Sequence, residues 1–264
     1  MSASVPTITV VTICRNAEAV IDATMVSVLT QRYPGLEYVI VVGESTDHTL
    51  DQVWAIAARF PHRPLRVIAE PDDGISDAMN KGVLAATGDV IAHLHAGDRY
   101  IDDRVLDHVM ASHQLDGWRW AAAESIVVNN RGRAFHTFRP RPEYRRLLKQ
   151  NFIPHQSVFL VRDVFERHGL FRTDLKQAMD YEFWLRLVFR GGERYHILPF
   201  ATTYFLDGGK SSQIWELLRH LRLIRRELRV WVPELTLLDD TSFLARVAIF
   251  GLYSRLISAR LRTP

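Results

Sequence analysis

The stretch "TITVVTI" at residues 7–13 decides the fold class. It is uncharged and rich in β-branched residues, which is typical of a strand covered on both faces. Similar runs recur at residues 37–42, 65–69 and 90–94, and the patterns between them predict helices at 17–30, 49–60 and 76–86, the first capped by Asn16. This alternation of strand and helix predicts an α/β fold, a mostly parallel sheet flanked by helices.

The regular alternation stops after residue 102. Strands are expected at 118–128, 134–138, 156–161 and 195–205, and helices at 144–149, 163–168 and 180–190. The last fifty residues form two apolar segments rich in arginine. We therefore divide the chain into a domain at residues 1–212 and a basic amphipathic helical segment at 213–264. Two interpretations of that segment stay open: it packs on the domain, or it lies on an anionic membrane.

Composition narrows the class of protein. With 47% hydrophobic and 24% charged residues over 264 positions, the chain has the composition of a folded protein with a sizeable core. A net charge of +3 predicts no nucleic-acid partner. The single cysteine, Cys14, lies in an apolar run and is expected to be a buried, unreactive thiol. Since the N-terminus does not look like a signal peptide and no long apolar span stands out, a cytoplasmic location is expected.

Polar loops follow each of the four early strands. They hold Arg15 and Asn16, then residues 43–49, 72–76 and 95–98. Ligands of parallel sheets bind beyond the carboxyl ends of the strands, so these loops are expected along one ligand-binding edge.

Asp98, in the stretch "HLHAGDRY" at 93–100, is the first candidate at this edge. It is either a cap of a short helix beginning near Tyr100 or a ligand of Mg²⁺ or Mn²⁺, which prefer oxygen ligands. His93 and His95 make zinc conceivable, but a third ligand at a convincing spacing is missing.

Two further clusters carry possible chemistry. Asp77 and Lys81 lie four residues apart, either as a surface ion pair or as groups that hold a nucleoside and a phosphate. Asp180, at the start of "DYEFWLRL", is either a helix cap or a general base at the rim of the site.

The ordered stretches "TVVTICRNA", "EPDDGISDAMNKGVLAATGD", "LHAGD", "HQSVFLVR" and "DYEFWLRL" closely resemble family-2 glycosyltransferases of the GT-A fold. The resemblance spans roughly residues 7–210. It is nearest to the bacterial subgroup that assembles exopolysaccharides, O-antigens and glycolipids. The family implies inverting, metal-dependent transfer from a nucleotide-sugar, most readily a UDP-sugar, to a saccharide or glycolipid acceptor.

The resemblance also assigns roles to individual residues. It implies Asp98 as the ligand of Mn²⁺ or Mg²⁺ and Asp180 as the base that deprotonates the acceptor. His155 and Gln156 match the acceptor side. The matching donor-binding positions are Thr12, Arg15, Asn16, Glu44, Asp47, Asp77 and Lys81, and Lys210 is a candidate to close over the diphosphate.

Two departures from the family pattern keep an alternative open. Val42-Gly43-Glu44 stands where the family usually has an aspartate, and His95 stands where a polar residue is common. A catalytically inactive nucleotide-sugar-binding protein is therefore the alternative function. A dinucleotide-dependent oxidoreductase is disfavoured because no GxGxxG follows the first strand.

Overall fold

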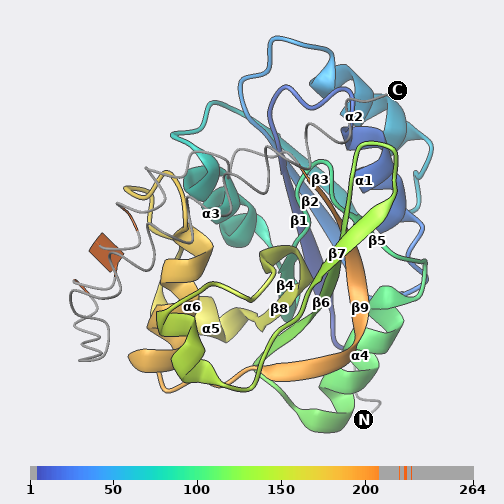
Figure 1. Ribbon diagram of the computed structural model, residues 1–264. Helices are drawn as coiled ribbons and strands as arrows, with labels where there is room; N and C mark the ends of the chain where they lie inside the picture. Colours follow the sequence, from blue (N-terminus) through green and yellow to red (C-terminus); the bar gives the residue numbers. More distant parts are fainter. Residues whose placement is uncertain (1–4, 208–219, 221–222, 225–226, 228–264) are drawn as a thin grey trace, which may run out of the picture.

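The computed structural model describes residues 5–207 together with residues 220, 223, 224 and 227 (Figure 1). Its centre is a nine-stranded sheet with the order β3-β2-β1-β4-β8-β6-β9-β5, and β7 pairs with β6. The first half alternates as the sequence predicts: β1 (Ile8–Cys14), α1 (Ile21–Leu29), β2 (Leu36–Val42), α2 (Thr49–Ala58), β3 (Leu65–Ala69), α3 (Ile75–Ala85) and β4 (Val90–His93). The pairs β1–β2, β2–β3 and β1–β4 are all parallel.

The second half adds strands of both directions. Its elements are β5 (Arg99–Tyr100), α4 (Val105–Asp116), β6 (Trp120–Val128), β7 (Ala134–Phe138), η1 (Tyr144–Leu148), η2 (His155–Ser157), β8 (Val158–Val161), α5 (Arg162–His168), α6 (Met179–Phe189) and β9 (His196–Leu206). Strand β8 runs antiparallel to both β4 and β6, whereas β9 runs parallel to β6. The sheet is therefore parallel in its first half and mixed in its second.

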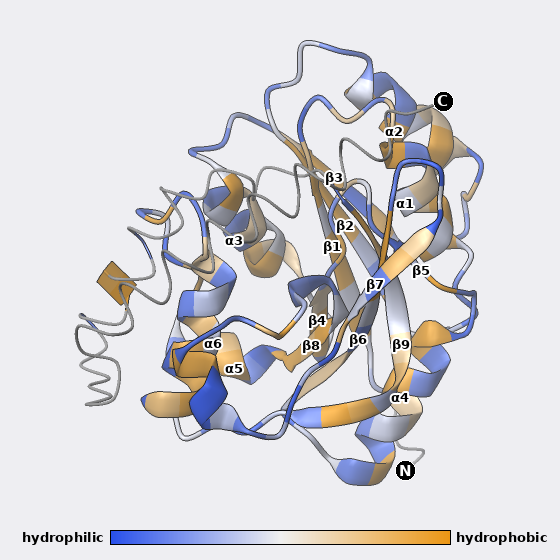
Figure 2. Cartoon of the chain, viewed as in Figure 1, coloured by the Kyte–Doolittle hydropathy of each residue, from blue (hydrophilic) through white to orange (hydrophobic). Residues whose placement is uncertain are grey.

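Each face of the sheet has its own hydrophobic core. Successive residues of β2 alternate between the cores, with Val39 and Val41 in one and Tyr38 and Ile40 in the other, as the two-residue period of a strand requires. The first core is covered by α3, α5 and α6, and the second by α1, α2 and α4. Hydropathy follows this arrangement, since the central strands are hydrophobic and the connecting loops hydrophilic (Figure 2).

Helix α4 and strand β5 were not predicted from the sequence. The buried residues of α4 are Val105, Leu106, Val109 and Met110, all in its first half, so the hydrophobic pattern covers under two turns. Its end is marked by Gly117, whose φ of 62° is left-handed. Strand β5 has two residues and pairs only with β9 among the described strands, which is too short for a pattern.

The prediction that Asn16 caps the first helix is wrong. Helix α1 begins five residues later, at Ile21, and no side chain caps it. Asn16 instead has a φ of 49° and accepts hydrogen bonds from the next polar loop. Asparagine adopts this left-handed conformation more readily than most residues.

Four described residues of the C-terminal segment are helical: His220, Leu223, Ile224 and Glu227. Ile224 is fully buried in the core beneath α5 and α6. Arg172 donates to the Glu227 carboxylate, and Arg190 donates to the Glu227 carbonyl at 2.9 Å. Lys210 lies outside the described residues, as do all other residues of the segment at 213–264. None of the described helices has the length and hydropathy needed to span a membrane.

Candidate functional site

The loops after β1 and β2 are bound together by hydrogen bonds. Arg15 Nε donates to the carbonyl of Glu44 at 3.1 Å, and Asn16 Oδ1 accepts from the backbone N–H of Thr46 at 2.8 Å. Asp47 accepts from the N–H of Glu18 at 3.1 Å and from the Thr49 hydroxyl at 2.6 Å. The hydrogen bond from Thr49, followed by those from backbone N–H groups, lowers the pKa of Asp47. The structure thus gathers four of the predicted donor-side residues in one pair of loops.

The loop after β3 and the start of α3 hold the next pair. Lys81 Nζ lies 3.1 Å from an oxygen of Asp77 and 3.1 Å from an oxygen of Glu70. Burial works against the lysine charge, but the hydrogen bonds to Glu70 and Asp77 leave its pKa raised. The pKa of Asp77 is lowered first by the backbone N–H of Asp73 and then by Lys81. The cation at this position is held in place by two carboxylates before any ligand binds.

Asp72 joins the second loop to the third. A Cβ at Gly43 would clash with the Asp72 carboxylate, so glycine is what allows this close approach. The other Asp72 oxygen accepts from the N–H of Gly74 at 3.0 Å. A carboxylate therefore lies beside the end of β2 although residues 42–44 contain no aspartate. Asp72 lies in the polar loop at 72–76 that was expected along the ligand-binding edge, but it was not among the predicted site residues.

Asp98 is buried, with 5% of its surface exposed. Its Oδ1 accepts from the backbone N–H of Leu206 at 3.2 Å, and burial raises its pKa to about 8. The helix-cap interpretation is wrong, because residues 99–100 form β5 and the next helix begins at Val105. Asp98 lies in the turn between β4 and β5, against the end of β9.

Three histidines lie between this turn and α6. The ring of His95 is 5.9 Å from that of His93 and 4.7 Å from that of His155. One buried nitrogen of each ring makes no hydrogen bond with the described residues: Nε2 of His93, Nδ1 of His95 and Nε2 of His155. Burial lowers the pKa of His93 to about 3 and lowers those of His95 and His155 as well. The cluster is therefore neutral near pH 7.

Asp180 lies next to this cluster. It is the second residue of α6, whose N-terminal cap is Ala178 at a φ of 60° and makes no side-chain capping bond, so the cap interpretation of Asp180 is also wrong. Its Oδ2 accepts from the amide Nδ2 of Asn151 at 3.1 Å, and its charge acts on His155. The His95–His155 ring contact links the turn that holds Asp98 with the helix start that holds Asp180. Asn151 was not singled out from the sequence.

Two predicted site residues are buried, Thr12 on β1 and Gln156 on η2. Thr12 is fully buried, and its hydroxyl donates to the carbonyl of Leu94 at 2.6 Å and lies 2.8 Å from the Tyr38 hydroxyl. Gln156 is 3% exposed and donates to Ser125 Oγ at 2.8 Å. Both side chains support the sheet beneath the ligand edge, and a direct contact with a ligand stays a prediction for each.

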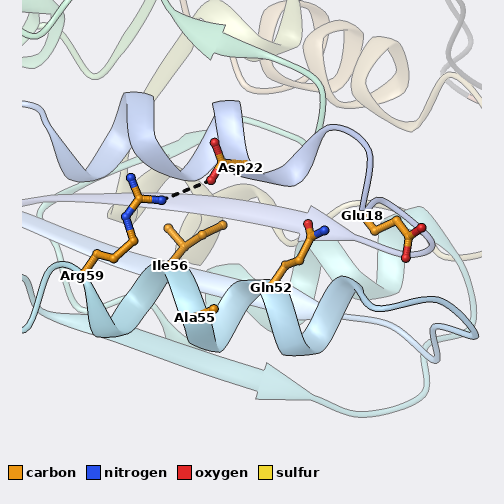
Figure 3. A pocket seen from close by; sticks show the side chains of 6 residues that line it. All are labelled: Glu18, Asp22, Gln52, Ala55, Ile56 and Arg59. Atoms are coloured by element: carbon orange, nitrogen blue, oxygen red, sulfur yellow. Dashed lines mark hydrogen bonds and ion pairs between the residues drawn. The ribbon is translucent and has the colours of Figure 1, made fainter.

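A surface hollow of about 380 Å³ lies elsewhere, between α1 and α2 (Figure 3). It is lined by Glu18, Asp22, Gln52, Ala55, Ile56 and Arg59, none of which was predicted to be in the site. Arg59 and Asp22 form an ion pair across it at 3.4 Å. The hollow borders the loop after β2 through Glu18, whose backbone N–H donates to Asp47 at 3.1 Å.

Comparison with known families identifies the fold and the enzyme class. Residues 9–168 match the family model described as glycosyl transferase family 2. The chain belongs to this family. The glycosyltransferase domain so identified contains the ligand edge through η2, whereas Asp180 lies beyond the matched residues.

This family-2 glycosyltransferase is similar in sequence to two curated relatives. The uncharacterized glycosyltransferase Rv1514c of Mycobacterium tuberculosis is 30% identical over 189 residues, which is 69% of this chain and 69% of the relative. The putative teichuronic acid biosynthesis glycosyltransferase TuaG of Bacillus subtilis is 26% identical and covers 84% of this chain and 88% of its own length.

Solved structures confirm the GT-A fold. TarS of Staphylococcus aureus in complex with UDP-GlcNAc aligns with a TM-score of 0.65 at 18% identity, covering 83% of this chain and 66% of TarS. The mannosyltransferase PcManGT of Pyrobaculum calidifontis, in complex with GDP-Man and Mn²⁺, aligns with a TM-score of 0.64 at 20% identity. It covers 87% of this chain, which spans 66% of the mannosyltransferase chain. This chain thus spans slightly less than two thirds of either neighbour.

Proposed function

We propose that this family-2 glycosyltransferase moves a sugar, with inversion, from a nucleotide-diphosphate-sugar to a hydroxyl of a saccharide or lipid-linked acceptor. The observation that carries the proposal is the placement of Asp180. It lies at the start of α6, oriented by Asn151 and connected through His155 and His95 to the turn that holds Asp98.

The donor side is formed by the loops after β1, β2 and β3. Arg15, Asn16, Glu44 and Asp47 border the nucleoside, with Thr12 supporting them from within the sheet. The Asp72 carboxylate beside Gly43 supplies an acceptor of hydrogen bonds at the position where the family aspartate is absent. Asp77 and Lys81 line the diphosphate side, and Lys210 stays a candidate to close over it. We favour a UDP-sugar, as the family resemblance implies. Because TarS binds UDP-GlcNAc and PcManGT binds GDP-Man, a GDP-sugar is the other donor to test.

Asp98 fits a hard divalent cation, Mn²⁺ or Mg²⁺. Its carboxylate forms no ion pair with a lysine or arginine among the described residues, and burial raises its pKa. No group of three His, Cys, Asp or Glu side chains within the described part of the chain is placed to hold a metal. A site with one protein carboxylate suits a cation whose other ligands are phosphate oxygens and water. When bound, the cation would neutralise charge on the diphosphate leaving group.

Asp180 performs the proton transfer. Its free oxygen accepts the proton of the acceptor hydroxyl, while the Asn151 amide holds the other oxygen in place. The acceptor oxygen then bonds to the anomeric carbon as the bond from that carbon to the diphosphate breaks. Attack opposite the leaving group inverts the anomeric centre. His155 and Gln156 lie on the acceptor side.

Two variants test the base. Asp180→Asn should abolish transfer while nucleotide-sugar affinity, measured by calorimetry with Mn²⁺, stays within about twofold. Asn151→Ala should lower kcat about tenfold to a hundredfold with little effect on the donor Kd. The substitution removes the hydrogen bond that orients Asp180 but removes no proposed contact with the donor. If wild-type protein binds the donor yet transfers nothing to any saccharide or glycolipid acceptor, and Asp180→Asn behaves identically, the inactive-binder alternative replaces the enzyme.

The donor and the cation are tested by thermal stability. A bound donor at about a hundred times its Kd stabilises the folded state by about 2.7 kcal/mol, so the correct nucleotide-sugar raises the melting temperature measurably. The increase should require Mn²⁺ or Mg²⁺ and should disappear in Asp98→Ala. An equal shift with and without the cation would contradict the metal role of Asp98.

A further inference from the structure

Residues 129–149, which we name the basic hairpin segment, carry an unusual charge. They include seven basic residues and a single acid, Glu143. The basic residues are Arg131, Arg133, Arg139, Arg141, Arg145, Arg146 and Lys149. The segment contains the turn between β6 and β7, all of β7 and the η1 turn. None of these residues has a role in the glycosyl transfer proposed above.

Most of the segment is exposed, and the charges of its arginines are largely uncompensated. Arg139 pairs with Glu124 at 2.9 Å, yet 65% of the arginine side chain remains exposed. The other five arginines are exposed and form no ion pair with an acid of the described residues. An anionic partner would therefore meet several cations that are free to bind it.

Two aromatic side chains accompany these cations. Phe135 is 54% exposed on β7, which pairs only with β6 among the described strands. Phe138, 37% exposed, lies on the other face of β7, where its ring is 6.3 Å from that of Phe205. The hairpin turn is strongly hydrophilic and lies at the opposite end of the molecule from α4 (Figures 1 and 2). Exposed phenylalanines beside arginines are the combination found on protein surfaces that lie in a lipid interface.

The register places this surface beside the candidate site. Val128 pairs with Ala134 of β7 on one side and with Leu206 of β9 on the other, and Leu206 donates to Asp98. The other end of the segment leads within two residues to Asn151, which holds Asp180. A flat surface that binds the segment would lie next to the acceptor side of the site.

We propose that the basic hairpin segment binds the surface of an anionic lipid bilayer, with the arginines at the headgroups and Phe135 in the interface. A second copy of this chain is disfavoured as the occupant, because it would bring the same uncompensated arginines to the contact. A soluble polyanion would satisfy the arginines but would leave Phe135 in water. The binding itself does not depend on the proposed sugar transfer.

Flotation of the full chain with vesicles tests the proposal. The wild type should bind vesicles of phosphatidylcholine mixed with phosphatidylglycerol, lose binding at high salt, and ignore pure phosphatidylcholine. The double variant Arg131→Ser, Arg133→Ser should bind about thirtyfold more weakly. Phe135→Ser should weaken binding as well, whereas Leu115→Ser, which removes an 85% exposed residue on α4, should not. Unchanged melting temperatures would establish that these surface variants fold.

A probe distinguishes this surface from the other basic region. A polarity-sensitive dye on Phe135→Cys should shift to the blue on anionic vesicles, and the same dye on Leu115→Cys should not. Labelling is selective because Cys14 is 6% exposed and burial raises its thiol pKa to about 12. The proposal is overturned if vesicle binding is weakened only by the double variant Arg255→Ser, Arg260→Ser. It is also overturned if soluble polyglutamate binds the wild type and Phe135→Ser equally well while vesicles bind neither protein.

Discussion

At the residue scale, the buried histidines give the protein a specific acid sensitivity. His93 is 5% exposed and its folded-state pKa of about 3 lies below the ordinary value of 6.5. Between about pH 3 and pH 6.5, His93 therefore binds a proton in the unfolded chain but not in the folded chain. The contribution of His93 to stability is complete above about pH 6.5 and is lost as the pH falls toward 3.

We expect His93 alone to lower the free energy of unfolding by about 2 kcal/mol between pH 6.5 and pH 5, since each pH unit in this range corresponds to about 1.4 kcal/mol. Urea unfolding at both pH values measures this. The variant His93→Gln should lose less stability on acidification than the wild type by about that amount. His62→Gln, at an exposed histidine before β3, should retain the full acid dependence. An identical dependence in His93→Gln and wild type would contradict the explanation.

The sequence predicted that Asp98 follows a strand and that Asp180 begins a helix, but not how either side chain is held. Asp98 and Asp180 lie where strand and helix boundaries placed them, because those boundaries follow from hydrophobic runs. Burial of Asp98 against Leu206 and orientation of Asp180 by Asn151 depend on contacts between residues 108 and 29 positions apart. Neither local spacing nor residue type contains that information, which is why both capping interpretations failed.

At the scale of elements, α6 contains a buried ion pair that fixes the helix to its surroundings. Glu182 is 3% exposed and accepts two hydrogen bonds from Arg186, at 3.1 and 2.9 Å. Arg186 also donates to the carbonyl of His168, the last residue of α5, and to that of Leu170, just beyond the helix. The pair thus joins α6 to the chain that leaves α5, and α6 is the helix that positions Asp180.

Glu182→Gln should destabilise the protein by about 3–5 kcal/mol, because it leaves the Arg186 charge buried without a carboxylate. The matched control is Asp163→Asn, which breaks ion pairs of Asp163 with Arg119 and Arg167 at a site where its side chain is 35% exposed. That change should cost less than about 1 kcal/mol per pair. Chemical denaturation measures both; a cost below 1 kcal/mol for Glu182→Gln would show that the buried pair is not essential to α6.

Elements were predicted best where the pattern of hydrophobic residues continued without interruption along the whole element. Strands β1, β2 and β3 and helices α2 and α3 lie within one or two residues of their expected bounds. Helix α4 was missed because its apolar residues occupy only the first half. The direction of β8 also escaped prediction, since a strand's neighbours are set by tertiary packing rather than by its own sequence.

At the scale of the whole molecule, the outstanding question is what the C-terminal segment does. Two interpretations follow from the sequence, packing on the domain and binding a membrane. Both relied on the same helical spacing of apolar residues. The described residues favour packing for the part around Ile224, which is fully buried in the core of α5 and α6, with Glu227 bound by Arg172 and Arg190. The period alone could not choose between the two because lipid and protein core both select apolar side chains.

Neighbouring residues in this segment separate the two interpretations. Ile224→Ala should lower the free energy of unfolding by about 2–5 kcal/mol, the usual cost of a cavity in a packed core. Leu223→Ala, at an adjacent residue that is 40% exposed, should cost less than half as much. Urea unfolding of the full chain without vesicles measures both. If the two variants are equally stable, the C-terminal segment does not depend on the domain core. Its arginines would then be available to bind a membrane together with the basic hairpin segment.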